Sequence, residues 1–189
     1  MSQAQLPVVV IGAGPVGLAA AAHLLARGLD PLVLETGAEI GHAVRAWSQV
    51  RMFSPWRYNT DAAARALLEP TGWQAPDPES YPTGGELLRD YLAPLAATPA
   101  LRGRIRTDSQ VIDIARRDHG RLHDGTSRAA APFVLHVAHL GEVQALEAAA
   151  VIDCSGTWTA PNPAGAHGIK APGEAANADR IAYGIPAVL

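Results

Sequence analysis

The chain has 189 residues, of which 48% are hydrophobic and 17% are charged, and its formal net charge is −3. A chain of this length buries one core, which argues against several domains. The near-neutral charge leaves no electrostatic footprint for nucleic acid, and the single cysteine, Cys154, excludes an internal disulfide and fits a cytoplasmic compartment.

The first predicted elements form one βαβ unit. Val8–Ile11 is a run of β-branched residues, which is typical of a strand buried on both faces of a parallel sheet. An Ala- and Leu-rich helix over Leu18–Arg27 follows and is closed by Gly28, and Pro31–Leu34 forms the second strand. The crossover between the two strands should be right-handed.

The same region also contains a long uncharged run, from Leu6 to Ala26. That length would span a bilayer. Glycines and a proline interrupt the run in its middle, and no flanking basic cluster or stop-transfer charges accompany it. We therefore expect no membrane segment.

Helices are predicted in the middle of the chain. Thr60 or Asp61 would cap a short helix over residues 62–68, and Thr83 with Glu86 has the spacing of a capping box for a helix beginning near Gly85. The apolar residues of this second helix recur at helical spacing and predict a buried face: Leu87, Leu88, Tyr91, Leu92 and Leu95. Pro94 should kink or shorten it.

From Arg104 the hydrophobic period changes to that of strands. Short apolar runs over residues 105, 111–114, 133–137 and 143–146, with polar turns at 120–127 and at Gly141, predict an antiparallel meander over about residues 105–147. A buried strand over 148–152 and an irregular tail over 157–189 complete the chain. The predicted fold is α/β, a Rossmann-like parallel sheet with an inserted small antiparallel β-meander, in a single domain spanning 1–189.

The motif that carries chemistry is Gly12-Ala13-Gly14-Pro15-Val16-Gly17, a G-x-G-x-x-G sequence between a strand and a helix, with Glu35 at the end of the next strand. Gly12 would permit the tight turn, Gly14 would let the backbone approach a pyrophosphate, and Gly17 would let helix and strand pack closely. The start of the helix offers free N–H groups and a partial positive charge to the diphosphate. Glu35 would accept hydrogen bonds from ribose hydroxyls and repel a 2′-phosphate. The alternative is a glycine-rich turn that binds nothing.

FAD and NAD share this half-site, so the rest of the chain must decide between them. A single-domain short-chain dehydrogenase would carry a Tyr-x-x-x-Lys pair. The only lysine is Lys170, and the residue four positions before it is Ala166. That class is therefore excluded.

Three stretches together resemble a known family. They are Val8–Glu35, then Arg51–Thr60 with Tyr81–Leu87, and finally Val151–Gly156 with Pro161 and Pro163. The last is similar to a hydrophobic-strand–Ala-Thr-Gly-x4-Pro signature, with Ser155 in the place of the threonine. The chain thus resembles the FAD-binding half of flavoproteins built on the glutathione-reductase plan, in particular flavin-containing monooxygenases and their bacterial relatives.

The resemblance implies roles for particular residues. Gly12, Gly14, Gly17 and Glu35 would hold the ADP part of FAD, and Val111 would hold the adenine through its main-chain groups. Gly156 would let the late strand approach the cofactor. Trp47, Ser54 and Asn59 would lie toward the isoalloxazine, where Asn59 is the one candidate for steadying an oxygen adduct, the alternative being a loop or helix-capping asparagine. The complete predicted cofactor set is Gly12, Gly14, Pro15, Val16, Gly17, Glu35, Thr36, Trp47, Ser54, Val111, Ser155 and Gly156.

The chain also departs from the family. Gly41-His42 replaces a Gly-Gly-x-Trp motif, and the monooxygenase fingerprint Phe-x-Gly-x-x-x-His is absent from residues 163–189. The sequence ends where the family would enter its second dinucleotide domain. We therefore expect the FAD-binding domain of an oxidoreductase, NAD(P)H-dependent and monooxygenase-like, that lacks its NAD(P)H domain, so that NADPH or NADH would bind only with that domain present.

Two alternatives remain open: a non-catalytic truncated dinucleotide-binding module, and an NAD-binding protein without flavin. The substrate is an unidentified small molecule, and no metal site is expected because the histidines lack ligand spacing. An apolar surface left by the absent domain would favour a homo-oligomer.

Overall fold

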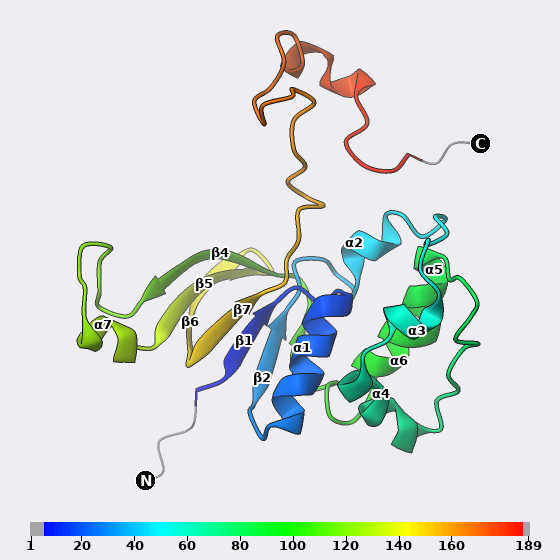
Figure 1. Ribbon diagram of the computed structural model, residues 1–189. Helices are drawn as coiled ribbons and strands as arrows, with labels where there is room; N and C mark the ends of the chain where they lie inside the picture. The colour runs from blue at the N-terminus through cyan, green and yellow to red at the C-terminus, as the bar shows by residue number, and fades with distance from the viewer. Residues whose placement is uncertain (1–5, 187–189) are drawn as a thin grey trace.

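The computed structural model describes residues 6–186 and confirms an α/β, Rossmann-like fold (Figure 1). Its centre is a four-stranded parallel sheet in the order β3-β2-β1-β7. The strands are β1 (Val8–Ile11), β2 (Pro31–Leu34), β3 (Ile105–Arg106) and β7 (Ala150–Asp153). In β1 both Val9 and Val10 are fully buried, so the β-branched run is covered on both faces, as the sequence predicts.

Helices cover one face of this sheet. Figure 1 shows α1 (Pro15–Ala26) in front of β1 and β2, with the other helices beyond it. The latter are α2 (His42–Arg45), α3 (Trp56–Asn59), α4 (Ala62–Leu68), α5 (Gly84–Leu87) and α6 (Ala93–Ala96), with a 3-10 turn η1 (Glu69–Thr71) and a π turn η2 (Leu88–Leu92). The predicted apolar face, Leu87 to Leu95, is buried in the core cluster on this side of the sheet.

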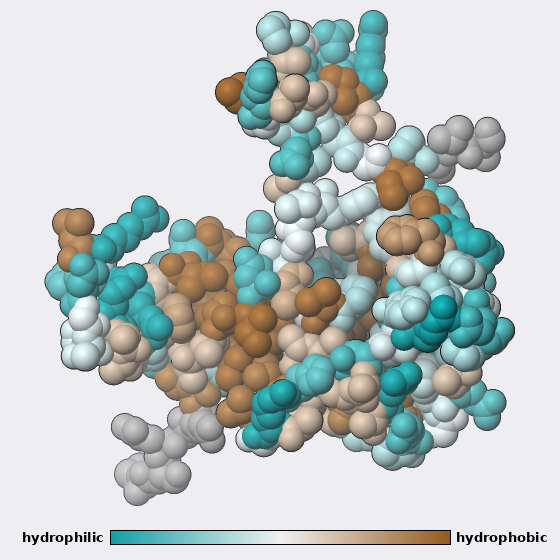
Figure 2. All heavy atoms as spheres, in the orientation of Figure 1, coloured by the Kyte–Doolittle hydropathy of each residue, from teal (hydrophilic) through white to brown (hydrophobic). Residues whose placement is uncertain are grey.

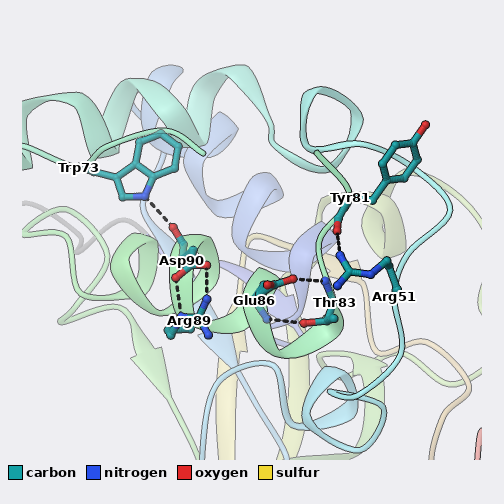
Figure 3. A network of polar contacts seen from close by, with 7 residues as sticks. All are labelled: Arg51, Trp73, Tyr81, Thr83, Glu86, Arg89 and Asp90. Atoms are coloured by element: carbon teal, nitrogen blue, oxygen red, sulfur yellow. Dashed lines mark hydrogen bonds and ion pairs between the residues drawn. The ribbon is translucent and has the colours of Figure 1, made fainter. Parts of the chain in front are cut away.

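Two of these helices begin at side-chain caps that the sequence predicts. Asp61 caps α4, because its Oδ1 accepts a 3.0 Å hydrogen bond from the N–H of Ala64. Before α5, the Thr83 hydroxyl accepts from the N–H of Glu86 at 3.1 Å, and Glu86 Oε2 accepts from the N–H of Thr83 at 2.6 Å (Figure 3). The capping box is therefore confirmed, and it satisfies two donors that the first turn would leave unpaired.

A three-stranded antiparallel sheet packs on the other face. It has the order β4 (Ser109–Arg116), β5 (Phe133–His139), β6 (Glu142–Ala148), with α7 (Thr126–Ala130) in the connection from β4 to β5. Its inward side chains join those of the parallel sheet in a second core cluster: Val9, Leu34, Leu135, Val137 and Ala148. Hydrophobic side chains are also exposed on these sheets, at Ile112, Ile114, Val143 and Ile152, and Figure 2 shows hydrophobic residues gathered over this part of the molecule.

The structure differs from the sequence-based elements at several boundaries. Ile105 lies in the parallel sheet, where it pairs with Val33, and is not part of the meander. β7 begins at Ala150, since Ala148 ends β6. α1 begins at Pro15, three residues before the predicted start, because a proline fits the first helical position, where no N–H is needed. α7 begins within residues 120–127, which the pattern assigns to a turn, and continues to Ala130.

The chain after β7 leaves the sheets. In Figure 1 the orange and red segment stands away from them, and its one regular element is the 3-10 helix η3 (Ala175–Arg180) among residues 157–186. This agrees with the irregular tail that the composition predicts. Nowhere between residues 6 and 186 does a helix have the length and apolar character needed to cross a membrane.

Candidate functional site

A cavity of about 350 Å³ lies at the carboxyl ends of β1, β2 and β7. This edge of an open parallel sheet is where α/β folds bind ligands, and the volume is in the range of small-molecule sites. Four segments far apart in the sequence form its walls, together with the start of α2. They are residues 11–15, 34–36, 109–111 and 154–159.

Each glycine of the G-x-G-x-x-G loop occupies its position for a different structural reason. Gly12 has a φ of +96°, and a Cβ there would lie 2.8 Å from the carbonyl oxygen of Cys154. A Cβ on Gly17 would lie 1.9 Å from the carbonyl oxygen of Gly12, so helix and turn can be this close only with glycine at this position. A Cβ on Gly14 would meet no atom within 4 Å, and Gly14 lines the cavity. The space beside Gly14 is thus open to a ligand.

The N-terminus of α1 contributes positive electrostatic potential to this space. Gly14 is the N-cap, Pro15 occupies the first helical position, and the N–H groups of the first turn have no partner inside the helix. Helix termini of this kind favour anions. The side chain of Val16 is exposed, and neither it nor Gly17 lines the cavity, so any contribution of these two residues to binding is through the main chain.

Glu35 lies in the cavity wall at the end of β2, with only 6% of its surface exposed. Its Oε2 accepts a 2.8 Å hydrogen bond from the N–H of Ala13, and its Oε1 accepts a 2.9 Å bond from the N–H of Gly37. An ionised carboxylate offers about four lone-pair positions, so each oxygen retains one. Glu35 therefore ties β2 to the glycine-rich loop and can still accept from a hydroxyl group in the cavity. Thr36, next to it, also lines the wall.

The end of β7 forms the opposite wall, with Cys154, Ser155 and Gly156. The N–H and hydroxyl of Ser155 both donate to Asp153 Oδ1, at 3.0 and 2.7 Å, and these bonds lower the pKa of Asp153. Burial, with a smaller contribution from the Asp153 charge, raises the pKa of the Cys154 thiol. Cys154 is therefore a protonated thiol near neutral pH, which fits an inert residue of the wall.

Val111 lines the cavity together with Ser109 and Gln110. β4 is an edge strand of its sheet, so main-chain groups on its outer side are not used in the ladder. The pairing with β5 is also irregular between Val111 and Asp113. The strand can therefore present main-chain donors and acceptors to a ligand, as the resemblance implies for Val111.

The three residues that the resemblance places toward the isoalloxazine have contacts outside this cavity. Trp47 packs against Gly84, where a Cβ would come within 2.5 Å of its ring. Ser54 and Asn59 bond each other: the Ser54 hydroxyl donates to Asn59 Oδ1 at 2.9 Å, and Asn59 Nδ2 donates to the carbonyl oxygens of Ser54 and Pro55. None of the three lines the cavity. The Asn59 amide, with both donors in use, ties the chain before α3 to the end of that helix.

Other residues of the wall carry no prediction from the sequence. His42, Ala43 and Val44 line it at the start of α2, and Thr157, Trp158 and Thr159 line it after β7. The hydrogen bond from the N–H of Gly41 to the carbonyl oxygen of Ala13, at 3.0 Å, brings α2 to the glycine-rich loop. In the sequence, the only sign that residues near α2 could belong to the site is that Gly41-His42 stands where the resemblance implies a Gly-Gly-x-Trp motif.

The three arginines between residues 45 and 57 have partners and do not line the cavity. Arg45 pairs with Glu39, and Arg57 pairs with Glu79, while Arg51 donates to the main-chain oxygen of Tyr81 (Figure 3). Over residues 6–186, no three or more His, Cys, Asp and Glu side chains gather as a metal-binding group.

Comparison with known proteins agrees with this geometry. Residues 9–134, more than half of the chain, match the family model described as pyridine nucleotide-disulphide oxidoreductase. No curated protein matches the chain.

Solved structures with the same fold include flavoenzymes of several kinds. Bacillithiol disulfide reductase from Bacillus cereus aligns with a TM-score of 0.65 at 20% identity, over 85% of this chain and 42% of that one. Oxidized steroid monooxygenase bound to NADP aligns with a TM-score of 0.59 at 22% identity, over 80% of this chain and 26% of that one. OTEMO in complex with FAD and NADP aligns with a TM-score of 0.56 at 19% identity, over 80% of this chain and 25% of that one. These identities establish a shared fold, and the chain spans less than half the length of each protein.

Proposed function

We propose, from the premise that this chain belongs to the pyridine nucleotide-disulphide oxidoreductase family, that its cavity holds the ADP portion of FAD. The chain would then be the FAD-binding part of an oxidoreductase. The observation that carries the proposal is the meeting of the glycine-rich loop, the Glu35 carboxylate and the end of β7 around one cavity.

The residues present fit such a cofactor. The open space beside Gly14 faces the N-terminus of α1, where a diphosphate would be stabilised by about 0.3–2 kcal/mol, depending on its burial. Glu35 supplies the acceptor for a ribose hydroxyl, and its buried charge would repel a 2′-phosphate. The edge strand at Val111 supplies main-chain groups for an adenine.

Each wall has a separate task in this proposal. Gly14 and the first turn of α1 bind the diphosphate, Glu35 orients the ribose, and Gly156 allows the chain to pass close to the cofactor. Bound FAD would accept a hydride and pass electrons onward, which is chemistry of the cofactor and not of these side chains. Reduction by NADPH or NADH, and a monooxygenase-like reaction, are proposed only for a protein that also supplies a second nucleotide site. A cofactor-free binding module and a protein that binds NAD alone are the competing proposals.

The test compares two glycines that have the same open space at the Cβ position. Neither Gly14 nor Gly103 has a positive φ, and a Cβ on either meets no atom within 4 Å, but only Gly14 lines the cavity. The purified chain is incubated with FAD and desalted, and its visible flavin absorption is measured. Wild type and Gly103→Val should retain flavin, and Gly14→Val should not, because its side chain fills the phosphate space.

Thermal unfolding of the cofactor-free proteins provides the control for folding. Gly14→Val should lose only about 1 kcal/mol, the usual difference between good and poor N-cap residues. A colourless wild-type protein that binds NAD in calorimetry would favour the NAD-binding alternative. Absence of binding to either nucleotide would contradict the proposed function, and equal flavin retention by both valine variants would contradict the assigned site.

A further inference from the structure

The tail after β7 contains one buried residue among residues 157–186, and that residue is a carboxylate. Glu174 has 4% of its surface exposed, whereas the rest of the tail is exposed or half-buried. Burying a charge is unfavourable unless hydrogen bonds satisfy it. The surroundings of Glu174 therefore determine how the tail is held.

Glu174 joins three places along the tail. Its Oε1 accepts from the N–H of Ala164 at 3.0 Å and from the hydroxyl of Tyr183 at 2.5 Å, and its Oε2 accepts from the N–H of Ala171 at 2.7 Å. All three partners are donors, so the site matches a carboxylate and not an amide. These bonds, with that from Tyr183 the largest, also lower the pKa of Glu174.

The residue after Tyr183 contacts an aromatic side chain of the cavity wall. A Cβ on Gly184 would lie 3.3 Å from both Cη2 and Cζ2 of Trp158, so the main chain passes directly against the indole ring. Trp158 is half-buried and lines the cavity between Thr157 and Thr159. The far end of the tail thus contacts the side chain of a residue that lines the cavity.

We propose that Glu174 is a positioning residue for Trp158: by holding Tyr183, it keeps Gly184 against the indole and the indole in the wall of the cofactor cavity. This inference rests on the proposed binding of FAD. The proposal adds Trp158, which lies outside the glycine-rich motif, to the residues that would contact the cofactor. It also assigns Glu174, which lies outside the cavity, the role of holding Trp158 in place. Trp158 would contribute apolar and aromatic contact to the bound cofactor.

Three substitutions test different steps of this connection. Glu174→Gln places an amide N–H₂ among three donors and so breaks at least one bond, and Tyr183→Phe removes only the hydroxyl. Gly184→Ala leaves Glu174 intact but pushes a methyl group toward the indole. Glu142→Gln, an exposed residue of β6 that does not line the cavity, is the matched control for the change of charge.

The measurement separates the position of Trp158 from the binding of FAD. The fluorescence of Trp158 is obtained as the difference between each protein and the same protein carrying Trp158→Phe, and its quenching by acrylamide is recorded without cofactor. FAD affinity is then measured by calorimetry. Glu174→Gln, Tyr183→Phe and Gly184→Ala should each change the quenching of Trp158 and weaken FAD on the order of three- to tenfold, the scale of one hydrogen bond. Glu142→Gln should change neither.

Each contrary result has a definite meaning. Unchanged Trp158 quenching in both Tyr183→Phe and Gly184→Ala overturns the positioning role, whether or not Glu174→Gln folds. Altered quenching with wild-type FAD affinity shows that Trp158 moves but does not serve the cofactor, and this also overturns the proposal. If wild type binds no FAD, the proposed function fails, whereas the quenching comparison still decides whether Glu174 holds the indole.

Discussion

The indole N–H of Trp73 donates a 2.7 Å hydrogen bond to the main-chain oxygen of Asp90 (Figure 3). In a regular α-helix that oxygen would accept from the N–H of residue 94, but residue 94 is a proline and has no N–H. The chain widens into the π turn η2 just before it. The sequence predicts a kink or a shortened helix at Pro94, whereas the structure has this π turn followed by α6, and a side chain from another segment satisfies the freed oxygen.

Trp73→Phe should destabilise the protein by about 1 kcal/mol, because the phenyl ring keeps the contact with Tyr91 but loses the N–H donor. Urea unfolding measures this difference. In a Pro94→Ala background the N–H of the introduced alanine becomes available to the Asp90 oxygen, so the same substitution should cost less. Equal losses in the two backgrounds would show that the bond does not compensate for the proline.

Gly17→Ala should destabilise the fold by about 3 kcal/mol or prevent folding, because its Cβ would lie 1.9 Å from the Gly12 carbonyl oxygen and both atoms are held by the main chain. Gly103→Ala adds the same methyl group in open space and should change stability by less than about 0.5 kcal/mol. Thermal and urea unfolding of the cofactor-free chain compare the two. A stable, native-like Gly17→Ala protein would contradict the close approach of α1 to the turn.

Glu35→Ala should have two separable effects. Without cofactor, it leaves the N–H groups of Ala13 and Gly37 unpaired and should lower the free energy of unfolding by about 1–3 kcal/mol. Loss of the ribose acceptor should weaken FAD by a further 1–3 kcal/mol, approximately, in calorimetry. Unchanged FAD affinity with reduced stability would limit Glu35 to tying β2 to the loop.

Asp61 should make stability depend on pH in the acid range. Burial opposes its ionisation, but hydrogen bonds from the N–H of Ala64 and from His23 outweigh burial and lower its pKa below the ordinary 3.8. Because the folded pKa is the lower one, this contribution is complete above pH 3.8 and is lost as the pH falls through the folded pKa. Asp61→Asn keeps an acceptor for the cap but has no charge to titrate.

Thermal unfolding between about pH 6 and about pH 3 measures this dependence. At neutral pH, Asp61→Ala should be about 1 kcal/mol less stable than wild type, and Asp61→Asn should lose less. The difference between wild type and Asp61→Ala should shrink with acidification. A difference that stays constant over this range would assign the cap to hydrogen bonding without charge.

Local chemistry accounts for the parts of the fold that the sequence predicts. The capping box of Thr83 and Glu86, the Asp61 cap and the strand–glycine loop–helix order all depend on residues within a few positions of one another. The cavity residues Gly12, Gly14 and Glu35 follow from the same order. Thr36, Val111, Ser155 and Gly156 line the cavity as well.

Contacts between distant segments account for the rest. Ile105 belongs to the parallel sheet because β3 pairs with β2. A strand of two residues is too short for its sequence to indicate which strand it pairs with. Trp158 lines the cavity and also contacts Gly184, near the far end of the tail. Trp47 lies away from the cavity because Gly84 provides a surface for its ring.

The position of β7 has a consequence for how the protein is made. β7 lies beside β1, so Val10 has Ile152 as its neighbour although more than two thirds of the chain separates them. During synthesis, β1 leaves the ribosome long before β7 has been made, so the edge of β1 that pairs with β7 stays unpaired until then. Late closure of this kind slows folding. A cofactor that contacts both strand ends would favour the closed form by mass action, so cellular supply of the nucleotide would influence how much newly made chain matures.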